Sequence, residues 1–235
     1  MTGLIAIYQK EMITYFRSPI AYFVVAVFLL GTGYFFVYNI FLTGEGTLDE
    51  TLRNMGLLLI TLMPVVTMRL FSGEYAARTM ELLMTLPLKP WQLVIGKHLG
   101  AVTLICLMTA ATAINLVPLY LYGSPETGTI VAGYLGFLLL GMACLAIGQL
   151  CSSLTENQIV AALITAPILL LFWWIGHLQT FQTSSVLRGL FTYLSFAQHF
   201  GDFIRGLVRS EGIAFYLIVT AVALTLNTSV LQWRR

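Results

Sequence analysis

Charged side chains are scarce in this 235-residue sequence, where Asp, Glu, Lys and Arg together make up 9% of the chain. Soluble domains carry about 25% charged residues, whereas 58% of the residues here are hydrophobic. The net charge of +2 is too small to indicate a nucleic-acid partner, because phosphate backbones are held by many Lys and Arg side chains. We therefore expect a polytopic membrane protein that forms one transmembrane domain over residues 1–235, with no soluble domain of its own.

Cysteines and catalytic motifs are scarce as well. The three cysteines are Cys106, Cys144 and Cys151. All lie in or beside apolar runs, where Cys behaves as a small hydrophobe, and their spacing fits neither a disulfide framework nor a metal site. The P-loop pattern G-x-x-x-x-G-K-[ST] is absent, because the Gly96-Lys97 pair is followed by His98. With no G-x-S-x-G or H-E-x-x-H either, we expect no catalytic residue, metal or cofactor in this chain, and energy supplied by a partner or a gradient.

The sequence contains six long apolar runs, and a run of about 20 residues is long enough to cross the hydrocarbon core as a helix. They lie at about 20–42, 52–71, 99–122, 130–150, 158–177 and 213–233. The first run follows Lys10, Glu11 and Arg17 and precedes no small-residue cleavage site, so we expect a retained span and not a signal peptide. The predicted fold is all-α, with six transmembrane helices.

Two segments outside these runs are amphipathic. Residues 3–17 place apolar side chains on one side of a helix and Lys10, Glu11 and Arg17 toward the other, which predicts an N-terminal interfacial helix. Residues 178–212 interleave apolar and charged side chains, a pattern typical of short re-entrant or interfacial helices. Both segments are expected to lie at the membrane surface.

Three arginines fall in the second of these segments, namely Arg188, Arg205 and Arg209. They could guide an anionic lipid-like or glycan substrate, contact a partner protein, or bind lipid phosphates. Basic residues beside a membrane most often bind lipid phosphates, and we favour that interpretation.

An even number of spans places both termini on one side of the membrane. With the N-terminus inside, eight Lys and Arg residues fall on the inner side and four on the outer side. The inner eight are Lys10, Arg17, Arg69, Arg78, Lys89, Lys97, Arg234 and Arg235, and the outer four are Arg53, Arg188, Arg205 and Arg209. The positive-inside rule then places both termini, and the segment between the second and third spans, on the cytoplasmic side of the membrane.

The segment between the second and third spans carries more charge than any other stretch between spans. A helix is predicted from Ser72, which can cap it, to Pro87, which stops it. Glu74, Arg78 and Glu81 would share one face of that helix at i, i+4 and i+7. This face suits the docking of a soluble partner, although a solvated helix with ordinary ion pairs, each worth about 0.2–0.5 kcal/mol, is the alternative.

The same segment, TMRLFSGEYAARTMELLMTLPLKPWQLVIGKHLG, resembles the cytoplasmic signature of exporter-type ABC transporter permeases of the second class. The shared pattern is an E-x-x-x-R-T-x-E-x-L-x-x-x-P helix followed by G-K at the third span. The opening YQKEMITYFRSPIAY and the corner SSLTENQIVA are also similar to that family, in particular to the permease of gliding-motility-type ABC systems. The resemblance covers essentially the whole chain.

This resemblance implies a six-span permease that pairs with a second copy or a paralogue. A separate cytoplasmic ABC ATPase would bind ATP and Mg and contact the coupling helix between the second and third spans. The residues it assigns to coupling are Glu74, Arg78, Glu81, Leu82, Leu86 and Pro87. The resemblance also implies a bacterial inner membrane as the location, with membrane lipids and a periplasmic auxiliary subunit as further expected partners. Reversing the charge of Glu74 or Glu81 should then leave the spans folded and weaken ATPase binding.

The expected function is therefore that of the membrane subunit of an ATP-driven exporter, which is not itself an enzyme. One alternative is a permease that transmits force to a periplasmic partner without passing a substrate. Another is a gradient-driven carrier, which would need acids or histidines buried in its spans. The predicted spans contain none at mid-span, and His177 lies at the end of the fifth span. Lys97 and His98 precede the third span, where a cationic anchor at the membrane surface is the simpler interpretation.

Overall fold

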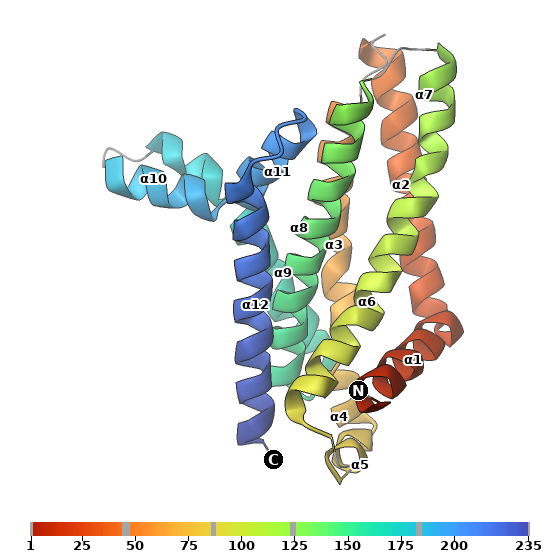
Figure 1. The fold of residues 1–235 in the computed structure, drawn as a ribbon, viewed down its shortest axis with the longest axis vertical. Coiled ribbons are helices and arrows are strands. Elements are labelled where there is room, and N and C mark those ends of the chain that lie inside the picture. The colour runs from red at the N-terminus through yellow and green to blue at the C-terminus, as the bar shows by residue number, and fades with distance from the viewer. Residues whose placement is uncertain (1, 44–47, 86–87, 123–125, 182–184, 235) are drawn as a thin grey trace.

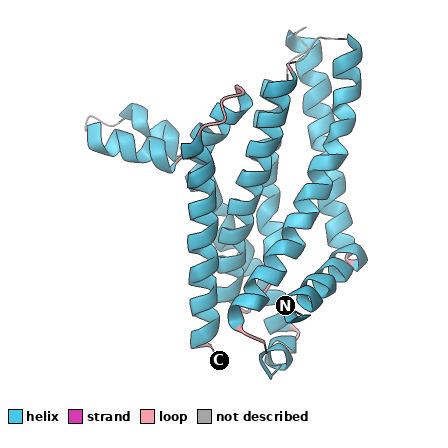
Figure 2. Ribbon diagram, viewed as in Figure 1, coloured by secondary structure: helices cyan, strands magenta, loops and turns pink. Residues whose placement is uncertain are grey.

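The computed structural model describes residues 2–43, 48–85, 88–122, 126–181 and 185–234. This part of the chain is helical, with no strand in it (Figure 2). Six helical stretches are long and apolar enough to cross a membrane, as the sequence predicts. The long helices that form them are α2 (Pro19–Thr43), α3 (Asp49–Thr67), α6 (Pro90–Thr112), α8 (Thr127–Leu154), α9 (Gln158–Trp174) and α12 (Ser210–Trp233).

Shorter helices lie at the two ends of this bundle (Figure 1). They are α1 (Thr2–Arg17), α4 (Ser72–Ala76), α5 (Thr79–Thr85), η1 (Ala113–Asn115), α7 (Leu116–Tyr122), η2 (Ile175–Phe181), α10 (Ser185–Leu194) and α11 (Phe196–Ile204). Both described ends of the chain lie at the same end of the bundle as α4 and α5, and we call this the terminal end. Helices α10 and α11 lie toward the opposite, far end, where α10 projects away from the bundle.

Helix α8 is the central helix of the bundle. It packs against α3, α6, α9, α11 and α12, and 72% of its most apolar stretch is buried, against 28% for α2, α9 and α12. The α11 contact is close at Gly136, where a Cβ would lie 2.5 Å from the Cβ of Phe203. Small residues permit such approach between helices in a membrane.

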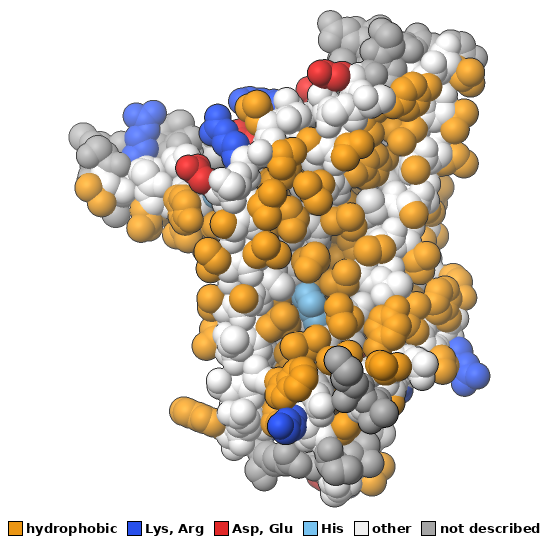
Figure 3. Space-filling model, viewed as in Figure 1, with side chains coloured by type: hydrophobic (Ala, Val, Ile, Leu, Met, Phe, Trp, Pro, Cys, Tyr) orange, Lys and Arg blue, Asp and Glu red, His pale blue; other side chains and the backbone are white. Residues whose placement is uncertain are grey.

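The outer surface of the bundle is apolar around its middle. Figure 3 shows hydrophobic side chains across the central part of the visible face, with Lys, Arg, Asp and Glu gathered toward its upper and lower edges. Leu30, Ile114 and Leu121 are each more than 70% exposed. A surface of this kind is stable only against lipid, so the chain is a multi-pass membrane protein.

The third long helix begins at Pro90 instead of Leu99. Proline suits the first helical position because it has no N–H to leave unpaired, and the N–H of Lys89 donates to Gln92 Oε1 at 3.0 Å. As a result Lys97 lies within α6, not before it. His98, which the predicted third span leaves outside, is for the same reason a buried residue of α6.

Candidate functional site

The segment between the second and third spans forms a corner of two short helices, α4 and α5, and not the single helix that the sequence predicts. The chain turns at Arg78, whose φ of 54° is a left-handed conformation that few residues other than glycine adopt. Glu74 and Glu81 therefore lie on different helices. Their expected alignment with Arg78 on one helical face is wrong.

The corner is joined to α8 by one hydroxyl group. Ser152 Oγ accepts hydrogen bonds from the backbone N–H groups of Phe71 and Ser72, both at 3.1 Å, and donates to Met68 O at 3.1 Å. Ser72 was expected to cap α4, but its own hydroxyl donates to Met68 O instead. The role of Ser152 was missed, although it belongs to the SSLTENQIVA corner that the sequence singles out.

An ionic cluster, made of Lys10, Glu11, Glu74 and Lys97, connects three helices behind this corner, and all of its side chains except Lys10 are largely buried. Lys97 Nζ on α6 lies 2.6 Å from Glu11 Oε1 on α1 and 2.9 Å from Glu74 Oε1 on α4. Lys10 on α1 also pairs with Glu74. The Lys97 side chain is 1% exposed, so it is not the lipid-facing anchor that its position in the sequence suggests.

The burial of this cluster makes it a structural joint. Removing one partner of a buried pair leaves an uncompensated charge and costs about 3–5 kcal/mol. The Glu74 side chain points into this cluster and is only 12% exposed. Glu74 is therefore not part of an outward coupling surface. The hydroxyl of Tyr15 on α1 lies nearby, and burial together with the Glu11 carboxylate raises the pKa of Tyr15, which keeps it protonated.

His98 forms a second polar contact inside the bundle. Its Nδ1 donates to Gln149 Oε1 on α8 at 3.3 Å, and Gln149 Nε2 donates to Val94 O at 2.9 Å. His98 is 3% exposed, so its predicted place at the membrane surface is also wrong. The described residues contain no group of three His, Cys, Asp or Glu side chains arranged to hold a metal ion.

The exposed side of the corner is formed by only part of the predicted coupling set. Arg78, Glu81 and Leu82 are exposed, with Leu82 at 67%. Leu86 and Pro87 lie outside the described residues. The outward surface of the corner therefore includes one cation, one carboxylate and a large apolar side chain close together in the chain.

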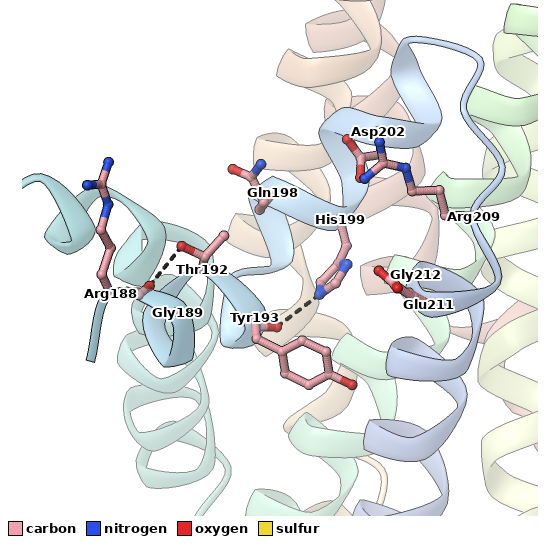
Figure 4. Close-up of a pocket in the computed structure, with 10 residues that line it drawn as sticks. All are labelled: Arg188, Gly189, Thr192, Tyr193, Gln198, His199, Asp202, Arg209, Glu211 and Gly212. Atoms are coloured by element: carbon pink, nitrogen blue, oxygen red, sulfur yellow. Dashed lines mark hydrogen bonds and ion pairs between the residues drawn. The ribbon is translucent and has the colours of Figure 1, made fainter. Parts of the chain in front are cut away.

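The far end holds a polar pocket of about 570 Å³ between α10, α11 and the start of α12 (Figure 4). Arg188 reaches it from α10, and Arg209 Nη1 lies 3.6 Å from Asp202 Oδ2 on its other side. His199 Nε2 lies 2.9 Å from Tyr193 O. The structure thus brings together two of the three arginines predicted for lipid or partner contact. The third, Arg205, is exposed and does not line the pocket.

Comparison with known proteins points to a single family. Residues 5–231 match the model of the ABC-2 family transporter proteins. The probable multidrug ABC transporter permease YbhR of Escherichia coli (strain K12) is 27% identical over 142 residues, which is 59% of this chain and 37% of YbhR. YbhR of Escherichia coli O157:H7 matches to the same extent. The chain thus spans well under half the length of these curated relatives. Because the family match covers nearly all of the chain and its six apolar helices, this protein belongs to the ABC-2 family of transporter proteins.

Proposed function

We propose that this chain is the membrane subunit of an ATP-driven ABC exporter. In this proposal it pairs with a second permease copy or paralogue, and a separate ABC ATPase binds ATP and Mg. The family match over residues 5–231 and the absence of a P-loop in the sequence support this division of labour. The similarity to a probable multidrug permease makes amphiphilic small molecules one class of cargo to test, whereas the gliding-motility resemblance rests on sequence motifs alone.

The terminal end is proposed to face the cytoplasm of a bacterial cell. It carries the corner, both described ends of the chain and the larger share of Lys and Arg side chains, which the positive-inside rule places on that side. The far end, with α10 and α11, would then face the periplasm. This orientation puts the corner where a soluble ATPase can reach it.

The observation that carries the proposal is the two-sided construction of the corner. Its outer side exposes Arg78, Glu81 and Leu82, while its inner side is tied through Glu74 to Lys97 on α6. An ATPase that displaced the outer side would therefore displace α6 and α1 as well, because a buried ion pair is costly to break. We propose that this is how nucleotide-driven movement reaches the spans.

Charge reversal at Glu81 tests this coupling. Glu81→Lys changes an exposed side chain, and such changes usually alter stability by no more than about 0.5 kcal/mol, so the permease should insert normally. Co-purification of the ATPase should fall about tenfold or more, as expected for the loss of a charged contact, and permease-dependent ATP hydrolysis should fall with it. Glu74→Lys is not an equivalent test, because it would also break the ionic cluster.

Glu126→Lys is the matched control, since Glu126 is exposed at the far end, just before α8, and should leave ATPase binding unchanged. Normal insertion of Glu81→Lys with undiminished ATPase binding would contradict both the coupling role and the orientation. Activity driven by a proton gradient without any ATPase would favour the carrier instead.

A second function, force transmission to a periplasmic partner without substrate passage, is favoured by the shape of α10. This helix projects from the bundle (Figure 1) and exposes the large side chains of Val186, Leu190 and Tyr193. The two functions separate in proteoliposomes that hold the permease and its ATPase. ATP hydrolysis with accumulation of a multidrug-type dye supports the exporter, whereas hydrolysis that depends on an intact α10 and moves no dye supports the transmitter.

A further inference from the structure

A second cavity lies at the terminal end, behind the corner, and the ionic cluster forms part of its wall. Its volume is about 580 Å³, within the usual range of small-molecule sites. Its walls come from α1, the start of α2, the ends of α3 and α4, α6 and the first residue of α9. The cavity thus lies where the N-terminal helix meets the transmembrane bundle.

The cavity has a surplus of positive charge. Four cationic side chains and two carboxylates line it, and they are Lys10, Arg17, Arg69, Lys97, Glu11 and Glu74. Both carboxylates are engaged by the two lysines in the ionic cluster. Two guanidinium groups therefore remain without an acidic partner in the described part of the chain.

Arg17 and Arg69 are these two residues. Arg69 contacts only neutral groups, with Nε donating to Gln158 Oε1 at 3.3 Å and Nη1 lying 3.5 Å from Ser18 Oγ. Arg17, at the end of α1, makes no ion pair with any described residue. Guanidinium groups bind phosphate oxygens through paired N–H donors, and both arginines line this cavity.

Two buried polar atoms at the cavity also lack partners. The Tyr15 hydroxyl and Glu74 Oε2 make no hydrogen bond to any described residue, and both residues line the cavity. Buried polar groups are nearly always hydrogen-bonded in folded proteins, so each of these atoms is suited to a ligand. The hydroxyl can donate to a phosphate oxygen, and the carboxylate oxygen can accept from a hydroxyl of the same head group.

An apolar pocket adjoins the polar cavity. Its volume is about 140 Å³, and it shares Tyr15, Ala21 and Leu104 with the larger cavity. Its remaining lining residues are Met12, Phe16, Tyr22, Val25, Gly100 and Leu107. A ligand with a charged head and a hydrocarbon tail fits this pair of spaces better than a free anion does. The tail gains free energy by covering the apolar pocket, whereas a free anion has no apolar surface to bury there.

We propose that this site binds an anionic phospholipid from the membrane leaflet at the terminal end. Its phosphate lies between Arg17 and Arg69, a head-group hydroxyl reaches Glu74 Oε2, and one acyl chain enters the apolar pocket. A choline head group is disfavoured by its charge and by hydrogen bonding, because it brings a further cation and no donor. The bound lipid would link α1 to the end of α3, and would thereby hold the N-terminal helix against the bundle.

The test uses the purified full-length chain without any ATPase, so its outcome is independent of the coupling proposal. Native mass spectrometry would follow titration with phosphatidylglycerol and with phosphatidylcholine of identical acyl chains. We expect one phosphatidylglycerol per chain, bound about tenfold more tightly than phosphatidylcholine, as the loss of one charged contact predicts. The Arg17→Gln/Arg69→Gln double variant should lose this preference.

Arg53→Gln is the matched control, because Arg53 is exposed and lies outside the cavity; it should bind phosphatidylglycerol as the unmodified chain does. Tyr15→Phe should weaken binding roughly twofold to tenfold, as the loss of one neutral hydrogen bond predicts.

Three results would overturn the proposal. Equal binding of the two lipids by the unmodified chain removes its charge basis, and this measurement needs no variant to fold. Undiminished binding by a correctly folded double variant removes the assignment to this cavity. Displacement of phosphatidylglycerol by an equal concentration of glycerol phosphate would show that the phosphate suffices, so that the ligand is not a lipid.

Discussion

The two ends of the molecule each hold a pair of a cation and a carboxylate, but in different surroundings. At the terminal end, Lys97 is 1% exposed and lies 2.6 Å from Glu11. At the far end, Arg209 is 60% exposed and lies 3.6 Å from Asp202. Water screens an exposed pair, and its side chains lose entropy when they are held together, so such pairs are worth about 0–1 kcal/mol. A buried pair cannot be opened without leaving a charge in a region of low dielectric constant.

This difference matches the packing at each end. Helix α1 lies along α6 through an extensive contact, whereas α10 projects from the bundle. The terminal end is therefore a fixed joint, and the far end presents an adaptable surface. In a transporter subunit, the fixed end is suited to receive force and the adaptable end is suited to contact changing partners or lipids.

The largest expected effect is at Lys97. Lys97→Met keeps the volume of the side chain but leaves Glu11 and Glu74 without their shared cation, so the free energy of unfolding should fall by about 3–5 kcal/mol. Thermal unfolding in detergent measures the change. Adding Glu11→Gln and Glu74→Gln should restore much of it, because no uncompensated buried carboxylate then remains. A loss no greater than that caused by Arg188→Met at the far end would contradict the comparison.

A pair of glycines provides an intermediate effect. A Cβ at Gly96 would lie 2.9 Å from Ile7 Cβ and 3.3 Å from Leu4 O, so Gly96→Ala must push α1 away from α6 and should cost about 1–3 kcal/mol. At Gly189 on α10 nothing lies within 4 Å, and Gly189→Ala should stabilise that helix by up to about 1 kcal/mol. Thermal unfolding in detergent would measure the stability of both variants, and limited proteolysis of α1 would report whether Gly96→Ala loosens that helix. Equal effects of the two substitutions would show that α1 and α10 are held alike.

The smallest effect is expected at Asp202. Asp202→Asn removes the charge of a partly exposed pair, with Arg209 60% and Asp202 22% exposed, and keeps its shape, so the free energy of unfolding should change by less than about 1 kcal/mol. Unfolding at low and high salt would show whether the pair contributes at all, because salt screens exposed charges. A loss as large as that of Lys97→Met would mean that the far end is held as firmly as the terminal end.

The six spans and the amphipathic character of residues 178–212 could be predicted, because a long apolar run and a helical stripe are signals within a continuous stretch of sequence. The turn at Arg78 could not, since neither Gly nor Pro marks it. The Lys97 pair could not either, because Glu11 lies 86 residues away and only the meeting of α1 with α6 brings the two together. The hydropathy pattern therefore places Lys97 just before a span. In the structure it lies within α6 and pairs with both Glu11 and Glu74.

The hydroxyl of Ser152 attaches the start of the corner to α8. By accepting from the backbone N–H groups of Phe71 and Ser72, it supplies the acceptor that the first amides of a helix lack, and it does so from α8. The start of α4 is thereby fastened to the most buried of the six spans, although the chain enters α4 from α3. A displacement of the corner would consequently act on α8 as well as on α3, and α8 packs against five other helices.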